Sequence, residues 1–305
     1  MVNILISGYY GFDNIGDESI LRTLVSSLRE HIPDCSLTVL SHNPTSTREK
    51  YGVEAVDRMS PMAILRAVKK CDMLISGGGS LLQDVTSSKS LHYYLSIIRC
   101  AEFFHKKVFI YSQGIGPIDR PGNRRAAAAA LKRADGIVVR DERSASLLEE
   151  IGIARDKVVI TADPVIRMKK PDGDVGAEIL RKAGVSLDGR LTVGWAIRER
   201  DTDSRFVKEL LRSIQMMKDK YNAQSVLIPF HYEEDGEVCR HIAAQLPDDT
   251  AVCLNEKYLS EDMLSIIGNM DLLVGVRLHS LIYAAIMGVP LIGISYDPKC
   301  TAFLN

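Results

Sequence analysis

The stretch Leu272–Lys299, LLVGVRLHSLIYAAIMGVPLIGISYDPK, decides the fold. It opens with a short apolar run, Leu272–Val276, and continues into Ser280–Met287, a run of small and apolar residues that is typical of a helix. A glycine and a proline then mark a turn into a second apolar run, Leu291–Ser295. Two strands that are joined by a helix are expected to be parallel neighbours in one sheet. The stretch therefore predicts an α/β protein.

Three basic side chains follow these two predicted strands. Arg277 and His279 come where the first strand ends, and Lys299 comes after the second. Because the strands are parallel, their carboxyl ends lie at the same edge of the sheet. Ligands of open α/β sheets bind at this edge. The sequence therefore predicts a site for an anionic ligand there.

The residues before this stretch continue the strand–helix alternation. The predicted strands are Leu191–Ile197, Val226–Phe230 and Ala251–Leu254, and the predicted helices are Asp203–Lys220, Glu233–Leu246 and Glu261–Asn269. Arg198 follows the first of these strands, where an unpaired charge on a buried strand would be costly, so we interpret it as a ligand-binding residue. His231 ends the second strand. We interpret it as a turn histidine, because no metal-ligand spacing accompanies it.

The first half of the chain shows the same alternation. Its predicted strands are Val2–Ser7, Leu37–Leu40, Met73–Ser76, Val108–Ser112, Ile137–Val139 and Lys157–Thr161. A segment rich in proline and charge, Asp163–Asp174, then interrupts the pattern and is interpreted as a linker. We predict two Rossmann-like parallel-sheet domains, residues 1–165 and 166–305, that face each other across a cleft.

A glycine-rich loop follows the first strand of the chain. Its sequence from Gly8 to Glu18 is GYYGFDNIGDE, which is neither a dinucleotide fingerprint nor a phosphate-binding P-loop. Glycines let the backbone approach a ligand closely, and the aromatic residues favour a sugar. The candidate ligand-binding residues of this loop are Asn14, Asp17 and Glu18. Capping of the following helix by Asp17 is the alternative explanation.

Two further glycine turns follow strands in this half. Gly77, Gly78 and Gly79 come directly after a strand, and three consecutive glycines favour a close backbone approach to an anion or a sugar over a merely flexible turn. The other candidate residues near these turns and strand ends are Gln83, Asp84, Gln113 and Arg140.

Composition excludes several classes of protein. The chain has 38 basic and 39 acidic residues, so it lacks the basic excess of a nucleic-acid-binding protein. Its six cysteines form no CxxC pair, which favours buried reduced thiols over a disulfide framework or a zinc site. Neither a secretory signal nor an apolar run long enough to span a bilayer is present. We therefore expect a cytoplasmic protein without a metal site.

Six ordered motifs together resemble the polysaccharide pyruvyl transferase family. They are GYYGFDNIGDESIL (8–21), DMLISGGGSLLQDVT (72–86), QGIGPI (113–118), VRDERS (139–144), GVRLHS (275–280) and SYDPKCTAFL (295–304). The resemblance is closest to the bacterial branch that pyruvylates the secondary cell-wall polymer on which S-layer proteins anchor. It implies a GT-B-like fold in which the first domain binds the acceptor and the second binds phosphoenolpyruvate.

The resemblance also implies a reaction. Phosphoenolpyruvate, a co-substrate with no further cofactor, would form a 4,6-linked pyruvate ketal on the β-linked N-acetylmannosamine of a lipid-linked disaccharide. That acceptor places the enzyme at the inner face of the cytoplasmic membrane. A GT-B glycosyltransferase that uses a nucleotide sugar, and a non-catalytic sugar-binding relative, are the alternative functions.

The family's functional residues carry over to Arg140, His279 and Lys299. His279 would transfer a proton or hold the phosphate, and the other two would stabilise the charge of the leaving group. Asp17 is the first candidate for the base, and Arg277 and Arg198 support donor binding. Two departures are expected to matter: Asp13 is charged within the first motif, and the chain is expected to lack the helix that would cover its last strand.

Overall fold

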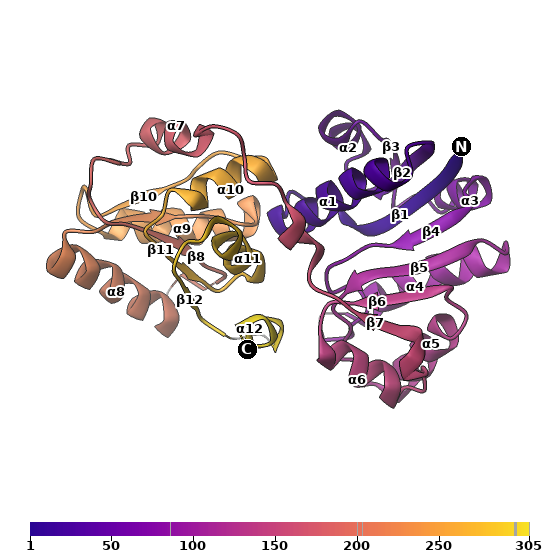
Figure 1. Ribbon diagram of the computed structural model, residues 1–305. Helices are drawn as coiled ribbons and strands as arrows, with labels where there is room; N and C mark the ends of the chain where they lie inside the picture. The colour runs from indigo at the N-terminus through magenta and orange to yellow at the C-terminus, as the bar shows by residue number, and fades with distance from the viewer. Residues whose placement is uncertain (86, 200, 203, 296–297, 305) are drawn as a thin grey trace. The chain divides into compact units, whose positions relative to one another are not determined.

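The computed structural model describes residues 1–85, 87–199, 201–202, 204–295 and 298–304, which form two compact units (Figure 1). The first unit comprises Met1–Phe12 and Asp17–Arg167. The second comprises Asp13–Gly16 and Met168–Asn305. The division at Arg167 lies two residues beyond the predicted one, and the assignment of Asp13–Gly16 to the second unit is a feature that the sequence did not predict.

The first unit is built on a parallel sheet. Seven strands among the described residues pair in the order β3-β2-β1-β4-β5-β6-β7. Their bounds are Val2–Tyr10 (β1), Cys35–Ser41 (β2), Glu54–Asp57 (β3), Met73–Ser76 (β4), Lys107–Gln113 (β5), Gly136–Val139 (β6) and Val158–Ile160 (β7). Helices cover both faces of this sheet (Figure 1).

The continuous apolar run of β1 is explained by these two layers of helices. Ile4 and Ile6 pack on one face with Leu21 and Leu24, whereas Leu5 lies in a separate core on the other face. A strand that is buried on both faces needs apolar residues at consecutive positions. The helices are Ile15–His31 (α1), Pro44–Tyr51 (α2), Pro61–Lys70 (α3), Ser88–Phe103 (α4), Pro121–Leu131 (α5) and Glu142–Glu150 (α6), and the 3-10 helices are Arg155–Lys157 (η1) and Pro164–Arg167 (η2).

The second unit repeats this architecture with a smaller sheet. Five parallel strands of the described chain pair in the order β10-β9-β8-β11-β12. They are Thr192–Ala196 (β8), Gln224–Leu227 (β9), Ala251–Cys253 (β10), Leu272–Gly275 (β11) and Leu291–Gly293 (β12). The helices are Val175–Lys182 (α7), Arg205–Tyr221 (α8), Tyr232–Gln245 (α9), Ser260–Gly268 (α10), Leu278–Met287 (α11) and Pro298–Leu304 (α12).

The strand order locates a candidate site in each unit. The order reverses between β1 and β4 in the first sheet and between β8 and β11 in the second. In open α/β sheets, ligands bind in the crevice outside the carboxyl ends of the strands where the order reverses. The predicted parallel α/β domains are therefore confirmed. The strand order makes the four loops that follow β1, β4, β8 and β11 the candidate ligand-binding loops.

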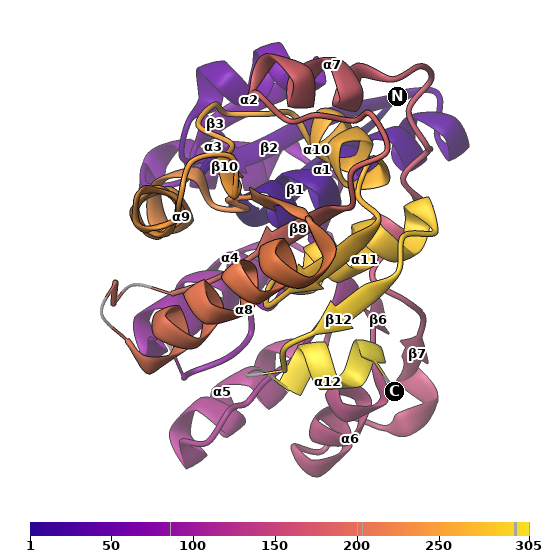
Figure 2. The ribbon, with the colours of Figure 1, turned by 90° about the vertical axis from the view of Figure 1, so that its left-hand side faces the viewer.

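Several elements differ from the prediction. Sequence analysis did not predict α2, β3 or α7, and it did not predict the short helix α12 that follows the last strand (Figure 2). α12 is only seven residues long and begins with a proline, so it shows too few turns for a helical period. Thr86, Asp203, Tyr296 and Asp297 of the quoted motifs and elements lie outside the described residues. No described helix is long and apolar enough to cross a membrane.

Candidate active site

The crevice of the first unit lies between the ends of β1 and β4. A Cβ atom on Gly77 would overlap the hydroxyl of Tyr10, so this glycine makes room for a fully buried tyrosine. Gly79 has a φ of +89°, which favours glycine, and a Cβ there would lie 2.9 Å from Oδ1 of Asp17. The structure therefore brings Asp17 to the glycine turn, and its role as a base stays a prediction. Burial and, next, the charge of Asp17 raise the pKa of Tyr10, which keeps its phenol neutral.

Other candidate residues of this unit bond to the protein itself. The Glu18 carboxylate accepts hydrogen bonds from the Gly11 N–H at 2.8 Å and from the Tyr51 hydroxyl. The side-chain amide of Gln113 donates to the Ser76 carbonyl at 3.0 Å and to its hydroxyl at 2.8 Å. These contacts hold the loop and the strand ends in place.

Two remaining candidates shape the glycine turn. Gln83 accepts a hydrogen bond from the Val85 N–H at 2.8 Å, within its own loop. A Cβ on Gly78 would lie 3.0 Å from Ile20, so this glycine allows close packing of the turn on α1.

Asp84 is a structural carboxylate in this structure. It is buried, and it accepts hydrogen bonds from the Asp119 and Arg120 N–H groups at 2.9 and 3.1 Å and from the Asn123 amide at 2.8 Å. Burial alone would raise the pKa of Asp84, but these hydrogen bonds outweigh it and hold the pKa below its ordinary value. A carboxylate that is saturated with donors and has a low pKa is a poor general base.

The Asp84→Ala variant is expected to lose about 2–4 kcal/mol of stability at pH 7, because three donors lose an ionised acceptor. The folded-state pKa lies below the unfolded value. The stability that the ionised Asp84 carboxylate contributes is therefore complete above about pH 4, and it is lost as the pH falls through the folded-state pKa. Urea unfolding of both proteins at neutral and acidic pH measures this difference.

The matched control for this substitution is Asp156→Ala, which removes an exposed carboxylate and is expected to change stability by at most about 0.5 kcal/mol. A stability difference for Asp84→Ala that does not shrink on acidification would show that its ionised form is not what stabilises the turn.

Arg140 lies at the end of β6 with its charge balanced inside the first unit. Its side chain is only 5% exposed, and Nη1 lies 2.9 Å from Oδ2 of Asp163. Nε lies 3.7 Å from Oδ2 of Asp141, and Nη2 donates to the Ser80 hydroxyl at 3.0 Å. A Cβ on Gly114 would lie 2.6 Å from Nη2, so this glycine gives the guanidinium its space. The role of Arg140 as a ligand for phosphoenolpyruvate stays a prediction.

Arg58 is a buried residue near this crevice that sequence analysis missed. Its guanidinium lies 4.7–5.8 Å from the ring centroids of Tyr9, Phe12, Tyr93 and Tyr94. It donates to the Gly8 carbonyl at 3.0 Å and to the Tyr94 hydroxyl at 3.2 Å. This aromatic cage holds the loop that follows β1. Nothing in the sequence around position 58 indicates it, because the five residues come from three separate stretches.

The loop aromatics stack on one another. The ring centroids of Tyr9 and Phe12 are 4.1 Å apart, those of Phe12 and the exposed His42 are 4.4 Å apart, and all three rings are nearly parallel. Both faces of the Phe12 ring are therefore covered by protein rings. The sequence predicted that aromatic rings of this loop stack on a sugar, and that role stays a prediction.

In the second unit, the segment Asp13–Gly16 reaches the end of β9. Asn14 forms an antiparallel bridge with His231, and the Ile15 N–H donates to the Phe230 carbonyl at 3.0 Å. Asp13 has a φ of 53° and pairs with Lys257 at 2.8 Å, a hydrogen bond that raises the pKa of Lys257. The Asp13 carboxylate therefore attaches this segment to the second unit.

His279 packs against this segment. A Cβ atom on Gly16 would overlap the imidazole, with Cε1 and Cγ only 2.6 Å away. The Asn14 side-chain oxygen accepts a hydrogen bond from the Gly16 N–H at 3.1 Å and fixes the local backbone. The half-buried His279 lies in the first turn of α11, beside the crevice between β8 and β11. The structure therefore joins the first and fifth motifs in one place.

Arg277 has a carboxylate partner that the sequence did not reveal. Its Nε donates to Oδ2 of Asp235 at 3.1 Å, and its Nη2 donates to the other oxygen of the same carboxylate. Asp235 is 1% exposed and also accepts the His231 N–H at 2.8 Å. The imidazole of His231 accepts from the Glu234 N–H at 3.3 Å and caps α9, which confirms the turn interpretation.

The last two predicted cations lie after two other strands of the second unit. Arg198 follows β8 by two residues, and Lys299 is the second residue of α12, which follows β12. Both side chains are half-buried. The structure therefore places Arg198, Arg277 and His279 on the segments after the two strands where the order reverses.

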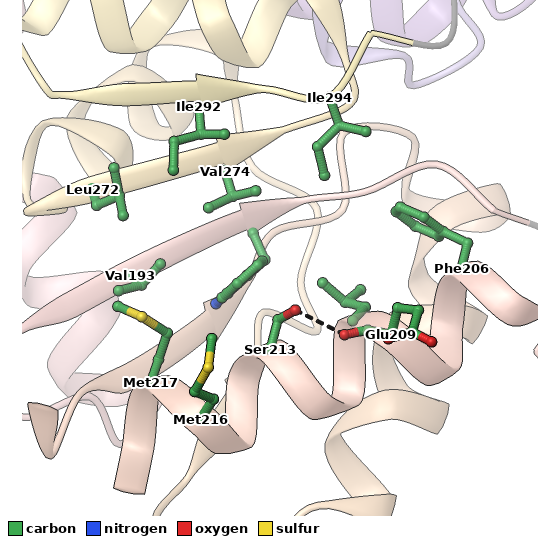
Figure 3. Close-up of a pocket in the computed structure, with 12 residues that line it drawn as sticks. Val193, Phe206, Glu209, Ser213, Met216, Met217, Leu272, Val274, Ile292 and Ile294 are labelled. Atoms are coloured by element: carbon green, nitrogen blue, oxygen red, sulfur yellow. Dashed lines mark hydrogen bonds between the residues drawn. The ribbon is translucent and has the colours of Figure 1, made fainter. Parts of the chain in front are cut away.

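A groove on the second unit is separate from these residues. It has a volume of about 310 Å³ and lies between α8 and strands β8, β11 and β12 (Figure 3). Met216, Ile292 and Trp195 are typical of its apolar lining, and the hydroxyl of Ser213 donates to the Glu209 carbonyl at 2.8 Å. None of the predicted site residues lines it, and its chemistry does not suit an anion.

Two parallel α/β units with polar groups at both strand-order reversals define a GT-B-like protein. The fold is similar to that of Anabaena HepE in complex with UDP-glucose, with a TM-score of 0.64 and 11% identity over 96% of this chain and 80% of that chain. It is also similar to UDP-GlcNAc 2-epimerase from Methanocaldococcus jannaschii, with a TM-score of 0.66 and 14% identity over 98% and 86% of the two chains. At such identities the likeness shows the fold alone.

The family follows from the sequence match. Residues 14–298 match the model of the polysaccharide pyruvyl transferase family, and the chain belongs to that family. It is 22% identical to the amylovoran biosynthesis protein AmsJ of Erwinia amylovora, over 98% of this chain and 84% of that protein. The protein is therefore a pyruvyl transferase.

Proposed function

We propose that this enzyme transfers the pyruvyl group of phosphoenolpyruvate to a sugar and releases phosphate. The product is a 4,6-linked pyruvate ketal, and the acceptor is the β-linked N-acetylmannosamine of a lipid-linked disaccharide, a precursor of the secondary cell-wall polymer that anchors S-layer proteins. The observation that carries the proposal is the packing of His279 against Gly16 beside the strand-order reversal of the second unit. A lipid-linked acceptor places the reaction at the inner face of the cytoplasmic membrane.

The charges of the second unit support an anionic donor. Phosphoenolpyruvate carries a carboxylate and a phosphate, so it needs several positive groups. We assign donor binding to His279 and Lys299, supported by Arg198 and by Arg277, which also holds the Asp235 carboxylate. Arg140 is assigned to the charge of the leaving phosphate, which would require it to share its guanidinium with Asp163.

In the reaction, the vinyl carbon of phosphoenolpyruvate gains one proton, and the two sugar hydroxyls each lose one. Protonation of the vinyl carbon of phosphoenolpyruvate makes C2 electrophilic, and the first sugar hydroxyl attacks it. Phosphate then leaves, and the second hydroxyl closes the ketal. Histidine is the side chain type best suited to general acid–base catalysis at neutral pH, so His279 is assigned to move a proton to the donor. Asp17, beside the glycine turn of the first unit, is assigned to accept a proton from the sugar.

The test is mass spectrometry of candidate lipid-linked disaccharides after incubation with phosphoenolpyruvate, with released phosphate measured in parallel. We expect one pyruvate ketal on the terminal sugar. The His279→Ala variant should fold normally and turn over at least about 100-fold more slowly, because general acid–base catalysis contributes on this scale. The Arg140→Ala variant should also be strongly impaired.

Two results would contradict the proposal. Folded His279→Ala and Arg140→Ala variants that consume phosphoenolpyruvate at the parental rate would refute the assigned roles. A titration in which UDP-sugars bind and phosphoenolpyruvate does not would instead favour a glycosyltransferase.

A further inference from the structure

One layer of helices in the first unit carries an excess of basic side chains. Helices α3, α4 and α5 pack side by side and cover the face of the first sheet that contains Leu5. Within the bounds of these three helices, Glu102 is the only acidic residue. Their lysines and arginines are Arg66, Lys69, Lys70, Lys89, Arg99, Arg124 and Arg125. The whole chain has 38 basic and 39 acidic residues, so this excess is a property of the layer and not of the composition.

The helices on the opposite face of the same sheet show no such excess. Helices α1 and α2 pack there, with Leu21 and Tyr51 in a separate core. Their charged residues are evenly mixed: Arg22, Arg29, Arg48 and Lys50 are basic, and Asp17, Glu18, Glu30 and Glu49 are acidic. A surface that only keeps a protein in solution needs no single sign of charge. The basic layer therefore indicates an anionic partner.

The exposed side of α3 combines cations with methionines. Met62, Arg66 and Lys69 are all exposed and recur at the spacing that places residues on one stripe of a helix. Met62 is 59% exposed, and Met59, which comes just before the helix, is 68% exposed. The sequence of α3, PMAILRAVKK, contains no acidic residue that could pair with these cations along the helix.

Helix α4 continues this surface. Nζ of Lys69 lies 5.1 Å from the ring centroid of Phe104, which follows the last turn of α4. Arg99 and Phe103 are exposed four residues apart on α4, and Phe103 is 75% exposed. We call the surface that these two helices share the basic face. Its members are Met59, Met62, Arg66, Lys69, Lys70, Arg99 and Phe103.

We propose that the basic face binds the surface of a bilayer that contains anionic lipids. Lysine and arginine side chains are attracted to anionic headgroups, and exposed apolar side chains are stabilised when they enter the boundary between headgroups and acyl chains. A soluble polyanion such as a nucleic acid would attract the cations but offers no apolar phase to Met59, Met62 and Phe103. The combination of both kinds of side chain therefore favours a lipid surface.

The position of the basic face relates it to the candidate crevice of the first unit. Met59 directly follows Arg58, whose guanidinium donates to the Gly8 carbonyl in the loop that connects β1 to α1. Helix α3 begins after the carboxyl end of β3, at the edge of the sheet where that loop also lies. Binding through this face would therefore bring the bilayer to the edge that we assign to the acceptor. Only this last consequence rests on the proposed function.

The test measures cosedimentation of the whole protein with vesicles in the absence of phosphoenolpyruvate and sugar. Vesicles of phosphatidylglycerol and phosphatidylcholine in equal amounts are compared with vesicles of phosphatidylcholine alone. We expect the anionic vesicles to be bound at least about tenfold more tightly, and we expect sodium chloride to weaken this binding because it screens the attraction. Equal binding to both kinds of vesicle, or binding to neither, overturns the proposal.

The triple variant with Arg66→Ser, Lys69→Ser and Lys70→Ser should bind the anionic vesicles about 100-fold more weakly. Each cation near such a surface strengthens binding about fivefold, and three are removed. All three side chains are exposed, so the variant should keep the parental midpoint of urea unfolding. A folded triple variant that binds like the parent refutes the basic face.

The matched control carries Lys169→Ser, Lys170→Ser and Lys182→Ser. It removes the same charge from exposed positions outside the basic face and should bind within about twofold of the parent. A control that loses as much binding as the triple variant would show that the net charge of the protein, and not this face, binds the lipid.

The apolar side chains have a test of their own. The double variant with Met62→Ser and Phe103→Ser keeps every cation and should bind the anionic vesicles about tenfold more weakly, because less apolar surface enters the bilayer. A folded double variant that binds like the parent would assign the face to a soluble polyanion and overturn the proposal.

The proposed reaction can fail independently of this surface. With a water-soluble disaccharide as acceptor, the triple and double variants should transfer pyruvate at the parental rate, since none of their changed residues belongs to the candidate active site. A parent that binds anionic vesicles but transfers no pyruvate would refute the proposed reaction and still support the basic face.

Discussion

Replacing Gly16 by alanine is expected to slow pyruvyl transfer about 100-fold while the protein stays folded. The new Cβ atom would overlap the imidazole of His279, whose Cε1 and Cγ would be 2.6 Å away. The ring must therefore shift, and a displacement of about 1 Å in an active site can cost this factor. Gly16 does not have a positive φ and lies in the first turn of α1, where alanine is acceptable to the backbone.

The measurement is phosphate release by the two proteins together with urea unfolding. Gly122→Ala is the matched control, because Gly122 lies in the first turn of α5 and a Cβ there meets no atom within 4 Å. This control should keep the parental rate. A Gly16→Ala protein that is as fast as the parent would show that the contact does not set the position of a catalytic His279.

Replacing Asp235 by alanine is expected to destabilise the protein by about 3–5 kcal/mol, because it leaves the guanidinium of Arg277 without its buried partner. The Asp235 side chain is 1% exposed and that of Arg277 is 14% exposed, so water replaces the lost carboxylate poorly. Urea unfolding measures the effect. Glu233→Ala is the matched control, since it removes an exposed acid from the same helical turn and should cost about 1 kcal/mol or less.

Removing both charges should restore most of the lost stability. The double variant with Asp235→Leu and Arg277→Met replaces a buried ion pair with apolar groups, a change that is often close to neutral. Recovery is not expected to be complete, because the His231 N–H also loses its acceptor. A double variant as unstable as Asp235→Ala would contradict the ion-pair explanation. If the folded double variant binds phosphoenolpyruvate more than about tenfold more weakly, Arg277 contributes to the ligand as well.

The α/β fold could be predicted because its signals are local. Buried parallel strands need consecutive apolar residues, so Val2–Ser7 and Leu272–Val276 were recognisable as runs bounded by glycines and polar residues. Predicted polar residues at strand ends do lie at one edge of each sheet. The order of the strands was not predictable from these runs. It depends on which neighbours each strand finds, and it is what singles out the loops after β8 and β11.

The candidate site was less predictable because its contacts join distant residues. The sequence indicated that Arg277 is a ligand-binding cation at the end of a strand. It could not indicate the carboxylate partner, Asp235, which lies 42 residues earlier on α9. Arg140 is balanced in the same way by Asp163, 23 residues later. A sequence reveals where a charge sits along a strand, whereas its partner depends on tertiary packing. Arg58 could not be predicted from the sequence, because the aromatic residues around it come together only in the folded chain.

The short segment Asp13–Gly16 has a consequence for the order of events during synthesis. The chain passes between its two units three times, after Phe12, after Gly16 and after Arg167. Asp13 emerges from the ribosome early, yet its partner Lys257 follows 244 residues later. At about 5–20 residues per second this is a delay of roughly 10–50 s. The first unit can therefore form its sheet before the Asp13–Lys257 pair exists, because that pair can form only after the second unit has been synthesised.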